Sequence, residues 1–526
     1  MRLLLLATLL IPLAAPAQTE ETFGESIDVR VVNVEAVVTD RKGQRVSGLT
    51  AGDFRLLVDG VEVPIDYFTE VAEGVALRAP SGASADSGVP APPPPTTAGP
   101  VGRSYLVYID ESLSIAAQRD VVLQEIERDL DRLGPEDRMA VVAFDGGRLH
   151  RLTDWTSDRK ALAGVFAEAR RRPAGAGGIL TLAERRSALG DHQLGQDDDF
   201  DFYSSEFRPY DSFEYLDVQP QQYSRLVRVV EAAAAALRSF SLPPGRKAML
   251  VLSGGWPLTR PTSRLVQDAN RLGYTLYPVD VPGIDIAQTV GDATAERPAD
   301  GPARILTSSW ELASHHTLHV LAEATGGREA LNSNRLAALE RAEEDTRSYY
   351  WLGFSPAWKA DDRHHRVELE VRRPGLSARA RSGFSDLSPT TLAEMETEGL
   401  LLFGIGDRQE GEDRLQVEIG EPRQAGWRTI DLPVTLVLPA SSAGAAGGRE
   451  TELVLSVGAL DKWGRRSELP QIPLEVALAD EAGPHAPVRS QVTLHLRNVE
   501  QRLVFHVRNA QTGDQLVEEV SFQPGK

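Results

Sequence analysis

The chain of 526 residues contains no cysteine. This absence excludes a disulfide framework, thiolate zinc sites, iron–sulfur clusters and a cysteine nucleophile. Basic residues are also scarce relative to acidic ones, 56 against 76, which gives a formal net charge of −20. Because a chain with this charge repels a phosphate backbone, nucleic acid is excluded from the expected partners.

Aromatic residues make up only 6% of the chain, whereas hydrophobic residues together make up 41%. This proportion is typical of a folded globular protein rather than of a disordered or fibrous one. The chain is too long for a single hydrophobic core, and about two to four domains are expected.

Long apolar runs are also missing, except at the N-terminus. Arg2 precedes an apolar run over residues 3–13, and a small-residue Ala-Pro-Ala site ends at Ala17. These features together predict a signal peptide over residues 1–17 with cleavage after Ala17; an uncleaved anchor is the alternative. The protein is therefore expected to be secreted or periplasmic, with no transmembrane span in the mature chain.

Two segments, 24–78 and 349–385, alternate apolar and polar residues with the two-residue period of half-buried strands. Within the first, Asp59-Gly60 predicts a hairpin turn between strands at 54–58 and 61–65. Each segment alone offers few strands and little core, so we expect the two to pair into one small β domain. Two separate small β units are the alternative.

Between these segments, a Pro/Gly-rich linker over residues 79–103 leads into a region, 104–348, in which strands and helices alternate. Strands are expected at 104–109, 139–144, 248–252 and 274–279, and helices at 122–133, 223–240, 262–272, 318–324 and 335–347. This alternation predicts an α/β fold with a mostly parallel central sheet, inserted in the small β domain. Residues 395–526 alternate again and predict a C-terminal β-sandwich.

The first strand of the α/β region is followed by the sequence Asp110-Glu111-Ser112-Leu113-Ser114. Ligands of parallel sheets bind outside the carboxyl ends of the strands, which is where this loop is expected. One carboxylate and two hydroxyls spaced by two are hard oxygen ligands that can face a small cation. Mg²⁺ suits such a sparse set because it retains waters. The alternative is that the two serines only cap the following helix.

This loop resembles the metal-ion-dependent adhesion site of the von Willebrand factor A (VWFA) family, which opens with Asp-x-Ser-x-Ser. Asp110, Ser112 and Ser114 match that motif. In the family the serines ligate the metal, the aspartate acts through water, and a carboxylate of a partner protein completes the coordination. The resemblance implies a Rossmann-like VWFA domain, Mg²⁺ (or Mn²⁺ or Ca²⁺) as cofactor, and adhesion-type protein binding.

Further blocks resemble bacterial, acidobacterial-type VWFA-related proteins and together span residues 24–385. These blocks are residues 29–34, Asp53-Phe54, Asp59-Gly60, 321–327, 348–354 and 378–384. Their ordered combination is more specific than any single block.

Two departures from the family pattern weaken the metal site. Ile179 and Leu180 separate two glycines from Thr181, so Thr181 would ligate the metal only after a backbone shift of two residues. Gly254 stands where the family has a second aspartate. With that carboxylate lost, metal affinity is expected to be weak or absent.

The acidic, aromatic segment 194–220 interrupts the α/β region and is expected to contact a partner, because aromatic side chains anchor interfaces. The residues predicted for this contact are Glu111, Phe202, Tyr203, Phe207 and Tyr210. A lid that packs on its own domain is the alternative.

His315, His319 and Glu323 would share one face of a helix. A zinc-protease helix needs a glutamate directly after its first histidine, and His316 occupies that place. No other motif assembles an acid, a base and a nucleophile. The main prediction is therefore a non-enzymatic interaction protein. A secreted metal-dependent hydrolase using these residues, or a structural scaffold with a decayed metal site, remain as alternatives.

Overall fold

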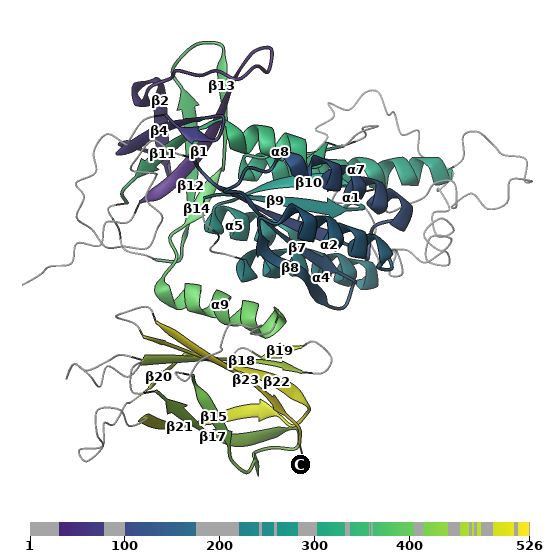
Figure 1. Cartoon of the computed structure of the whole chain (residues 1–526), viewed down its shortest axis with the longest axis vertical. Coiled ribbons are helices and arrows are strands. Elements are labelled where there is room, and N and C mark those ends of the chain that lie inside the picture. Colours follow the sequence, from purple (N-terminus) through teal and green to yellow (C-terminus); the bar gives the residue numbers. More distant parts are fainter. Residues whose placement is uncertain are drawn as a thin grey trace, which may run out of the picture.

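The computed structural model describes residues 31–77, 100–174, 220–240, 243, 245–256, 260–281, 302–331, 337–356, 358, 361–403, 414–439, 453–461, 465–467, 471–474, 488–509 and 514–524. Figure 1 shows three units along the long axis: a β unit, a central unit of strands and helices, and a C-terminal β unit. Helix α9 (Pro389–Phe403) lies between the second unit and the third.

The first β unit is built from two segments that are far apart in the sequence. Its strands are β1 (Val32–Asp40), β2 (Phe54–Val58), β3 (Val61–Val63), β4 (Tyr67–Ala72), β5 (Val75–Ala76), β11 (Tyr349–Phe354), β12 (His364–Val371), β13 (Leu376–Ala380) and β14 (Gly383–Ser385). They form antiparallel sheets of order β13-β1-β11-β4-β5 and β14-β12-β2-β3, so both sheets combine strands of both segments. Asp59 and Gly60, with φ of 50° and 79°, form the β2–β3 turn, as a type I′ hairpin requires.

The central unit contains one sheet of order β10-β9-β6-β7-β8. Its strands are β6 (Arg103–Asp110), β7 (Arg138–Phe144), β8 (Leu149–Thr156), β9 (Arg246–Ser253) and β10 (Tyr274–Asp280). Its helices are α1 (Ala116–Arg128), α2 (Arg159–Arg171), α4 (Pro220–Ser239), α5 (Ser263–Leu272), α7 (Pro302–Thr325) and α8 (Ala338–Arg347). Short 3₁₀ turns are η1 (Ala51–Asp53) in the first unit, and η2 (Asp129–Arg132) and η4 (Arg260–Thr262) in this one. Neighbouring strands from β10 to β7 pair in parallel, whereas β8 pairs antiparallel with β7.

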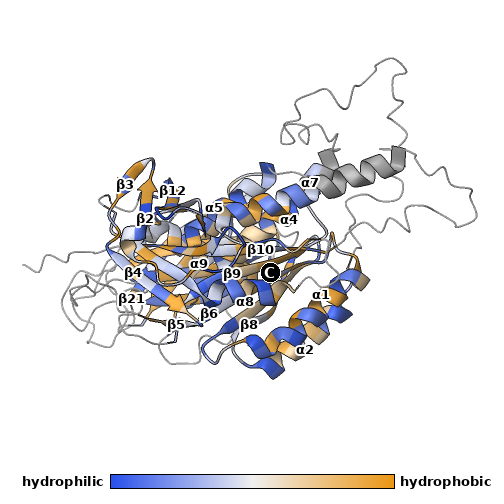
Figure 2. Cartoon of the chain, turned by 90° about the horizontal axis from the view of Figure 1, so that it is seen from above, coloured by the Kyte–Doolittle hydropathy of each residue, from blue (hydrophilic) through white to orange (hydrophobic). Residues whose placement is uncertain are grey.

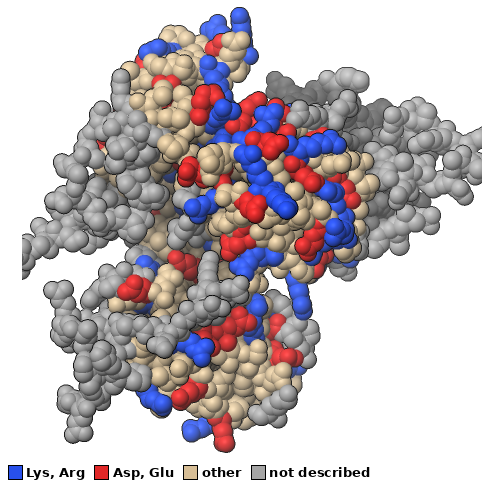
Figure 3. Space-filling model, viewed as in Figure 1, with Lys and Arg blue, Asp and Glu red and all other residues tan. Residues whose placement is uncertain are grey.

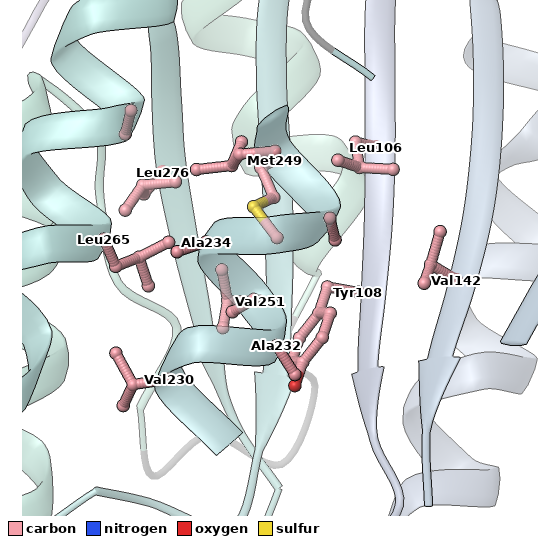
Figure 4. Packing of buried hydrophobic residues seen from close by; sticks show 14 of the residues in the cluster. Leu106, Tyr108, Val142, Val230, Ala232, Ala234, Met249, Val251, Leu265 and Leu276 are labelled. Atoms are coloured by element: carbon pink, nitrogen blue, oxygen red, sulfur yellow. The ribbon is translucent and has the colours of Figure 1, made fainter. Parts of the chain in front are cut away.

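Helices cover both faces of this sheet because alternate strand residues point to opposite sides. Leu106 and Tyr108 of β6 belong to the core shared with α4 and α5, whereas Val107 belongs to the core shared with α1, α2 and α8. Figure 4 shows α4 lying across the strands with Ala232 and Ala234 on its path, and small side chains at these positions allow close approach. Figure 2 shows hydrophobic and hydrophilic residues on α1 and α2, as expected for amphipathic helices.

The C-terminal unit is formed by two antiparallel sheets. Its strands are β15 (Gln416–Ile419), β16 (Arg423–Gln424), β17 (Thr429–Leu438), β18 (Leu453–Asp461), β19 (Arg466–Ser467), β20 (Ile472–Leu474), β21 (Val488–Arg497), β22 (Gln501–Asn509) and β23 (Gln515–Phe522). One sheet joins β15, β17, β16 and β21, and the other joins β19, β18, β22, β23 and β20. Their inward-facing residues, including Leu432, Leu455 and Phe505, form one hydrophobic core.

The predicted fold class, α/β with a Rossmann-like and mostly parallel central sheet, is wrong for this chain. More of the described residues lie in strands than in helices, and four of the five sheets found in them are antiparallel. The remaining sheet is mixed because of β8, which the sequence interpretation missed. Leu149, Leu152 and Trp155 follow one another at a spacing of three, and the β7–β8 ladder shifts register twice. These irregularities remove the two-residue period that would reveal a strand.

No helix among the described residues is both long and apolar enough to span a bilayer. The predicted signal peptide at 1–17 lies outside the described residues, and the predicted linker at 79–103 is described only from residue 100.

Helix α9 joins the central unit to the C-terminal unit through packing and through a buried histidine. Leu400 and Leu401 of α9 pack on Val504 and Val517, on the outer side of the β22–β23 ladder. His506 Nδ1 lies 2.9 Å from the hydroxyl oxygen of Thr397 on α9, and His506 has no exposed surface.

The stability of this junction is expected to fall as the pH falls from about 6.5 to about 4. Burial lowers the pKa of His506 to about 4, with the nearby Arg508 acting in the same direction, whereas an unfolded histidine has a pKa of about 6.5. Because the unfolded chain binds the proton first, acidification favours unfolding, by up to about 3 kcal/mol.

Urea unfolding of wild type and His506→Gln at pH 7 and pH 4.5 measures this effect. The wild type should lose more stability on acidification than the variant, which has no imidazole to protonate. His495→Gln is the matched control, because the His495 side chain is 64% exposed and bonds Asp431 at the surface. Equal acid sensitivity in wild type and His506→Gln would contradict the assignment.

Candidate functional site

The candidate site lies at the carboxyl edge of the central sheet, where β6 ends at Asp110 and β9 ends at Ser253. Because these neighbouring strands run parallel, their carboxyl ends meet at the same edge. The loop after β6 carries the predicted Asp-x-Ser-x-Ser motif, and α1 begins directly after it.

Five hydrogen bonds end on the Asp110 carboxylate, which has no exposed surface. Its Oδ1 accepts from the Ser112 hydroxyl at 2.7 Å, the Ser112 amide at 3.1 Å and the Leu113 amide at 3.2 Å. Its Oδ2 accepts from the Ser253 hydroxyl at 2.7 Å and from the indole Nε1 of Trp256 at 3.3 Å. Both carboxylate oxygens are therefore occupied by neutral donors of this chain.

Burial raises the pKa of Asp110 above its ordinary value, because desolvation disfavours the charged form. Hydrogen bonds from Ser253, Ser112 and Trp256 oppose this effect by stabilising the carboxylate. The Asp110 carboxylate thus belongs to a hydrogen-bonded network in the protein interior and is not exposed at the surface.

The two predicted serines differ in their surroundings. Ser112 donates to Asp110, whereas the hydroxyl of Ser114 is buried and has no hydrogen-bond partner in the described part of the chain. Neither serine caps α1, whose N-cap residue is Ile115 without a side-chain cap. The structure therefore contradicts the alternative that the two serines cap helix α1.

The residues at this site fit a divalent cation poorly. The Ser114 hydroxyl, which has no hydrogen-bond partner in the described chain, and the lone pairs of Ser112 are suitable oxygen ligands. Of the described residues predicted to ligate the metal, Asp110 alone carries a carboxylate, and Gly254 contributes none. Within the described residues, no cluster of three or more His, Cys, Asp or Glu side chains is placed to hold a metal. Mg²⁺ sites in proteins depend on carboxylate ligands, and here both oxygens of the Asp110 carboxylate already accept hydrogen bonds from groups of this chain.

Glu111, predicted to contact a partner, turns away from the site and is 1% exposed. Its carboxylate accepts from Arg172 at 2.7 Å (Nε to Oε1) and 3.1 Å (Nη2 to Oε2), and Arg119 Nη1 lies 3.8 Å from its Oε1. Because Arg119 is also fully buried, this ion pair ties α1 to the end of α2. The carboxylate is consequently not available at the surface.

Several predicted site residues lie outside the described residues, namely Thr181 and the aromatic residues Phe202, Tyr203, Phe207 and Tyr210. Of the segment 194–220, only Pro220, the first residue of α4, is described.

The histidines and the glutamate of the hydrolase alternative are not brought together around one point. His315 Nε2 bonds Asp280 Oδ2 at 3.0 Å, at the end of β10. His319 is half exposed and lies 3.1 Å from Glu329 and 3.7 Å from Glu323, measured from its Nδ1 and Nε2 respectively. The two histidines thus face different carboxylates.

Sequence reasoning did not identify Ser253 and Trp256 as hydrogen-bond donors to Asp110. Both residues lie more than 140 positions away from Asp110 in the sequence. One available signal was the position of Ser253-Gly254-Gly255-Trp256 directly after a buried strand, where parallel neighbours share an edge. Gly255 has φ of 100° and packs against Ser314, which a β-carbon would approach to 2.6 Å, so this tight turn needs glycine.

No protein-family model matches this chain, and no curated protein matches its sequence.

Proposed function

We propose that this protein is a secreted or periplasmic, non-enzymatic protein-interaction protein of the VWFA-related type, which binds its partner without a tightly held metal. The observation that carries the proposal is the Asp110 carboxylate, which is buried and accepts five hydrogen bonds from neutral donors. Such a carboxylate supports the loop from within. It neither transfers protons with solvent nor attacks a substrate.

The resemblance of the Asp110 loop to an adhesion motif supports the interaction part of the proposal. The local contacts support the metal-free part, because two hydroxyls, two amides and an indole stabilise the carboxylate by hydrogen bonds where a cation would otherwise do so. A second form of the proposal is that Mg²⁺, Mn²⁺ or Ca²⁺ binds weakly through Ser112 and Ser114. The comparison of melting temperatures in Mg²⁺ and EDTA, described below, tests this form.

A scaffold with a decayed metal site rests on the same buried Asp110 and differs only in lacking a partner. A metal-dependent hydrolase is less well supported, because His315 is bonded to Asp280 whereas His319 faces Glu323 and Glu329. Zinc analysis of the purified protein separates the hydrolase from the other two, since a hydrolase of this kind would hold stoichiometric zinc.

Millimolar Mg²⁺ is expected to leave the melting temperature of the wild type unchanged relative to EDTA. A site with micromolar affinity would instead stabilise the protein by about 3 kcal/mol or more at such excess. Asp110→Asn is expected to lower stability by about 1–3 kcal/mol in both buffers, because its amide group places a donor against donors. Differential scanning calorimetry in the two buffers measures both effects.

Asp131→Asn is the control for loss of one negative charge, because Asp131 is 93% exposed on η2. A metal-dependent rise in melting temperature that Asp110→Asn abolishes would overturn the metal-free proposal.

Partner binding is tested by capture from envelope extract on the immobilised full mature chain, in EDTA and in Mg²⁺. Captured proteins are identified by mass spectrometry, and their affinity is then measured with purified components. The proposal expects one saturable partner with equal affinity in both buffers. No saturable partner would favour the scaffold.

A further inference from the structure

A cleft of about 640 Å³ lies at the seam between the central unit and the C-terminal unit. One wall comes from the end of β7, the β7–β8 turn and α4, and the opposite wall comes from α9, β18, β19, β22 and β23. The β7–β8 turn also adjoins the Asp110 loop, since a β-carbon on Gly146 would lie 3.2 Å from Ser112 Cβ. The cleft therefore opens beside the candidate site, and its volume is typical of ligand sites.

The lining of the cleft combines apolar and charged side chains. Its apolar residues are Phe144, Leu149, Ala232, Ala235, Leu402 and Leu460. Its acidic residues are mostly neutralised by arginines. Asp461 Oδ2 lies 2.9 Å from Arg497 Nη1 and 3.1 Å from Arg465 Nε, and Glu231 lies 3.7 Å from Arg264.

Two arginines of the cleft have no such partner. Arg148 in the β7–β8 turn and Arg228 on α4 are exposed, and neither side chain forms an ion pair or hydrogen bond with any described residue. By contrast, Arg466 pairs with Glu398, and Arg502 lies 3.8 Å from Glu519. The wall formed by the central unit thus presents two free guanidinium groups.

The charge of the whole surface does not decide what this cleft attracts. Figure 3 shows acidic and basic side chains interspersed over the described residues of the face in view, and charges more than about 10 Å apart are screened at moderate salt. Within the cleft, Glu500 is the one acidic lining residue of the described chain that lacks an arginine partner, and it accepts from Gln523 at 3.4 Å. Among the described lining residues, the two unpaired arginines and the one unpaired carboxylate therefore leave the cleft with a net positive charge.

A buried amide in the opposite wall, formed by the C-terminal unit, indicates a ligand that also donates hydrogen bonds. Gln501 lines the cleft and is 2% exposed. Its Nε2 donates to the Arg497 carbonyl at 2.6 Å, but its Oε1 has no hydrogen-bond partner among the described residues. A small carboxylate anion offers only acceptors, whereas a peptide offers backbone N–H donors as well as carboxylates.

We propose that this cleft binds a short acidic peptide segment of a partner protein, with its carboxylates on Arg148 and Arg228 and an apolar side chain against Leu149, Leu402 and Leu460. This inference rests on the proposed protein-interaction function and names its contact site. Arginine pairs with carboxylates through planar, bidentate hydrogen bonds, and a partly apolar pocket supplies the anchor that interface hot spots require.

Fluorescence anisotropy with a fluorescein-labelled peptide of alternating glutamate and leucine tests the proposal on the full mature chain. The wild type is expected to bind it saturably and more weakly as salt rises, and not to bind the matched lysine–leucine peptide. Arg148→Glu and Arg228→Glu should each weaken binding several-fold, and the double variant by about tenfold or more. Their melting temperatures should equal that of the wild type, because no ion pair is lost.

Arg138→Glu is the matched control, since Arg138 is an exposed arginine at the opposite end of β7 and forms no ion pair with described residues. Binding that is absent, that weakens equally in Arg138→Glu, or that citrate displaces as effectively as unlabelled peptide would overturn the proposal. Capture of the envelope partner by the Arg148→Glu/Arg228→Glu variant, at wild-type affinity, would overturn the cleft assignment while the proposed function stands.

Discussion

Replacing Gly327 with alanine is expected to lower the free energy of unfolding by more than about 4 kcal/mol, or to prevent folding of the central unit. Gly326 ends α7 in the left-handed region with φ of 78°, and the chain then passes directly against β10. A β-carbon on Gly327 would lie 1.8 Å from the carbonyl oxygen of Leu276. That carbonyl belongs to a strand paired along its length with β9, so relief of the clash would require breaking the ladder.

Gly164→Ala provides the matched comparison, because Gly164 is exposed on α2 and a β-carbon there would meet no atom within 4 Å. It should be neutral or stabilising by up to about 1 kcal/mol, since alanine favours the helix over glycine. Urea unfolding followed by far-UV circular dichroism, together with the yield of soluble protein, measures both variants. Similar stability of the two variants would contradict the prediction that the close approach of Gly327 to β10 excludes a β-carbon.

Asp345→Ala is expected to destabilise the junction between the first β unit and the central unit by about 3–5 kcal/mol, as removal of one partner from a buried ion pair does. Asp345 is 1% exposed and binds three arginines. Its Oδ1 accepts from Arg45 at 2.7 Å, and its Oδ2 accepts from Arg379 at 2.8 Å and from Arg328 at 3.0 Å. Without the carboxylate, three guanidinium groups from different segments would repel one another.

Glu344→Ala is the control for that variant, because Glu344 is the adjacent residue, is 52% exposed and pairs only with Arg328 among the described residues. It should cost less than about 1 kcal/mol, as exposed ion pairs usually do. Calorimetry should show a lower melting temperature for Asp345→Ala alone. Equal losses of stability in the two variants would contradict the prediction, because the three arginines around Asp345 would then stabilise the protein no more than an exposed ion pair does.

Much of the secondary structure could be predicted from the local pattern. Strands expected at 349–354 and 376–380 coincide with β11 and β13, and the Asp59-Gly60 turn forms the predicted hairpin. The apolar strands at 104–109 and 274–279 extend by only one or two residues. The hydrophobic period of these strands and the turn residues that flank them indicate which residues are buried, because neighbouring residues in a strand face opposite sides.

The fold class could not be predicted in the same way. The expectation of a mostly parallel sheet depended on the central region alone, and the irregular β8 pairs antiparallel there. Hydrophobic period shows that a residue is buried, but it does not show which strand lies beside which. Register and direction depend on contacts between segments that are distant in the sequence.

The sequence by itself determined that a loop of oxygen-bearing side chains follows the first strand of the central unit. Only the tertiary structure decided what that loop does. It buried Asp110 under Ser253 and Trp256, turned Glu111 into an ion pair with Arg172, and left Arg148 and Arg228 facing an open cleft. The physical reason is that the charge state and availability of a side chain depend on its neighbours in space, and those neighbours are supplied by folding rather than by local sequence.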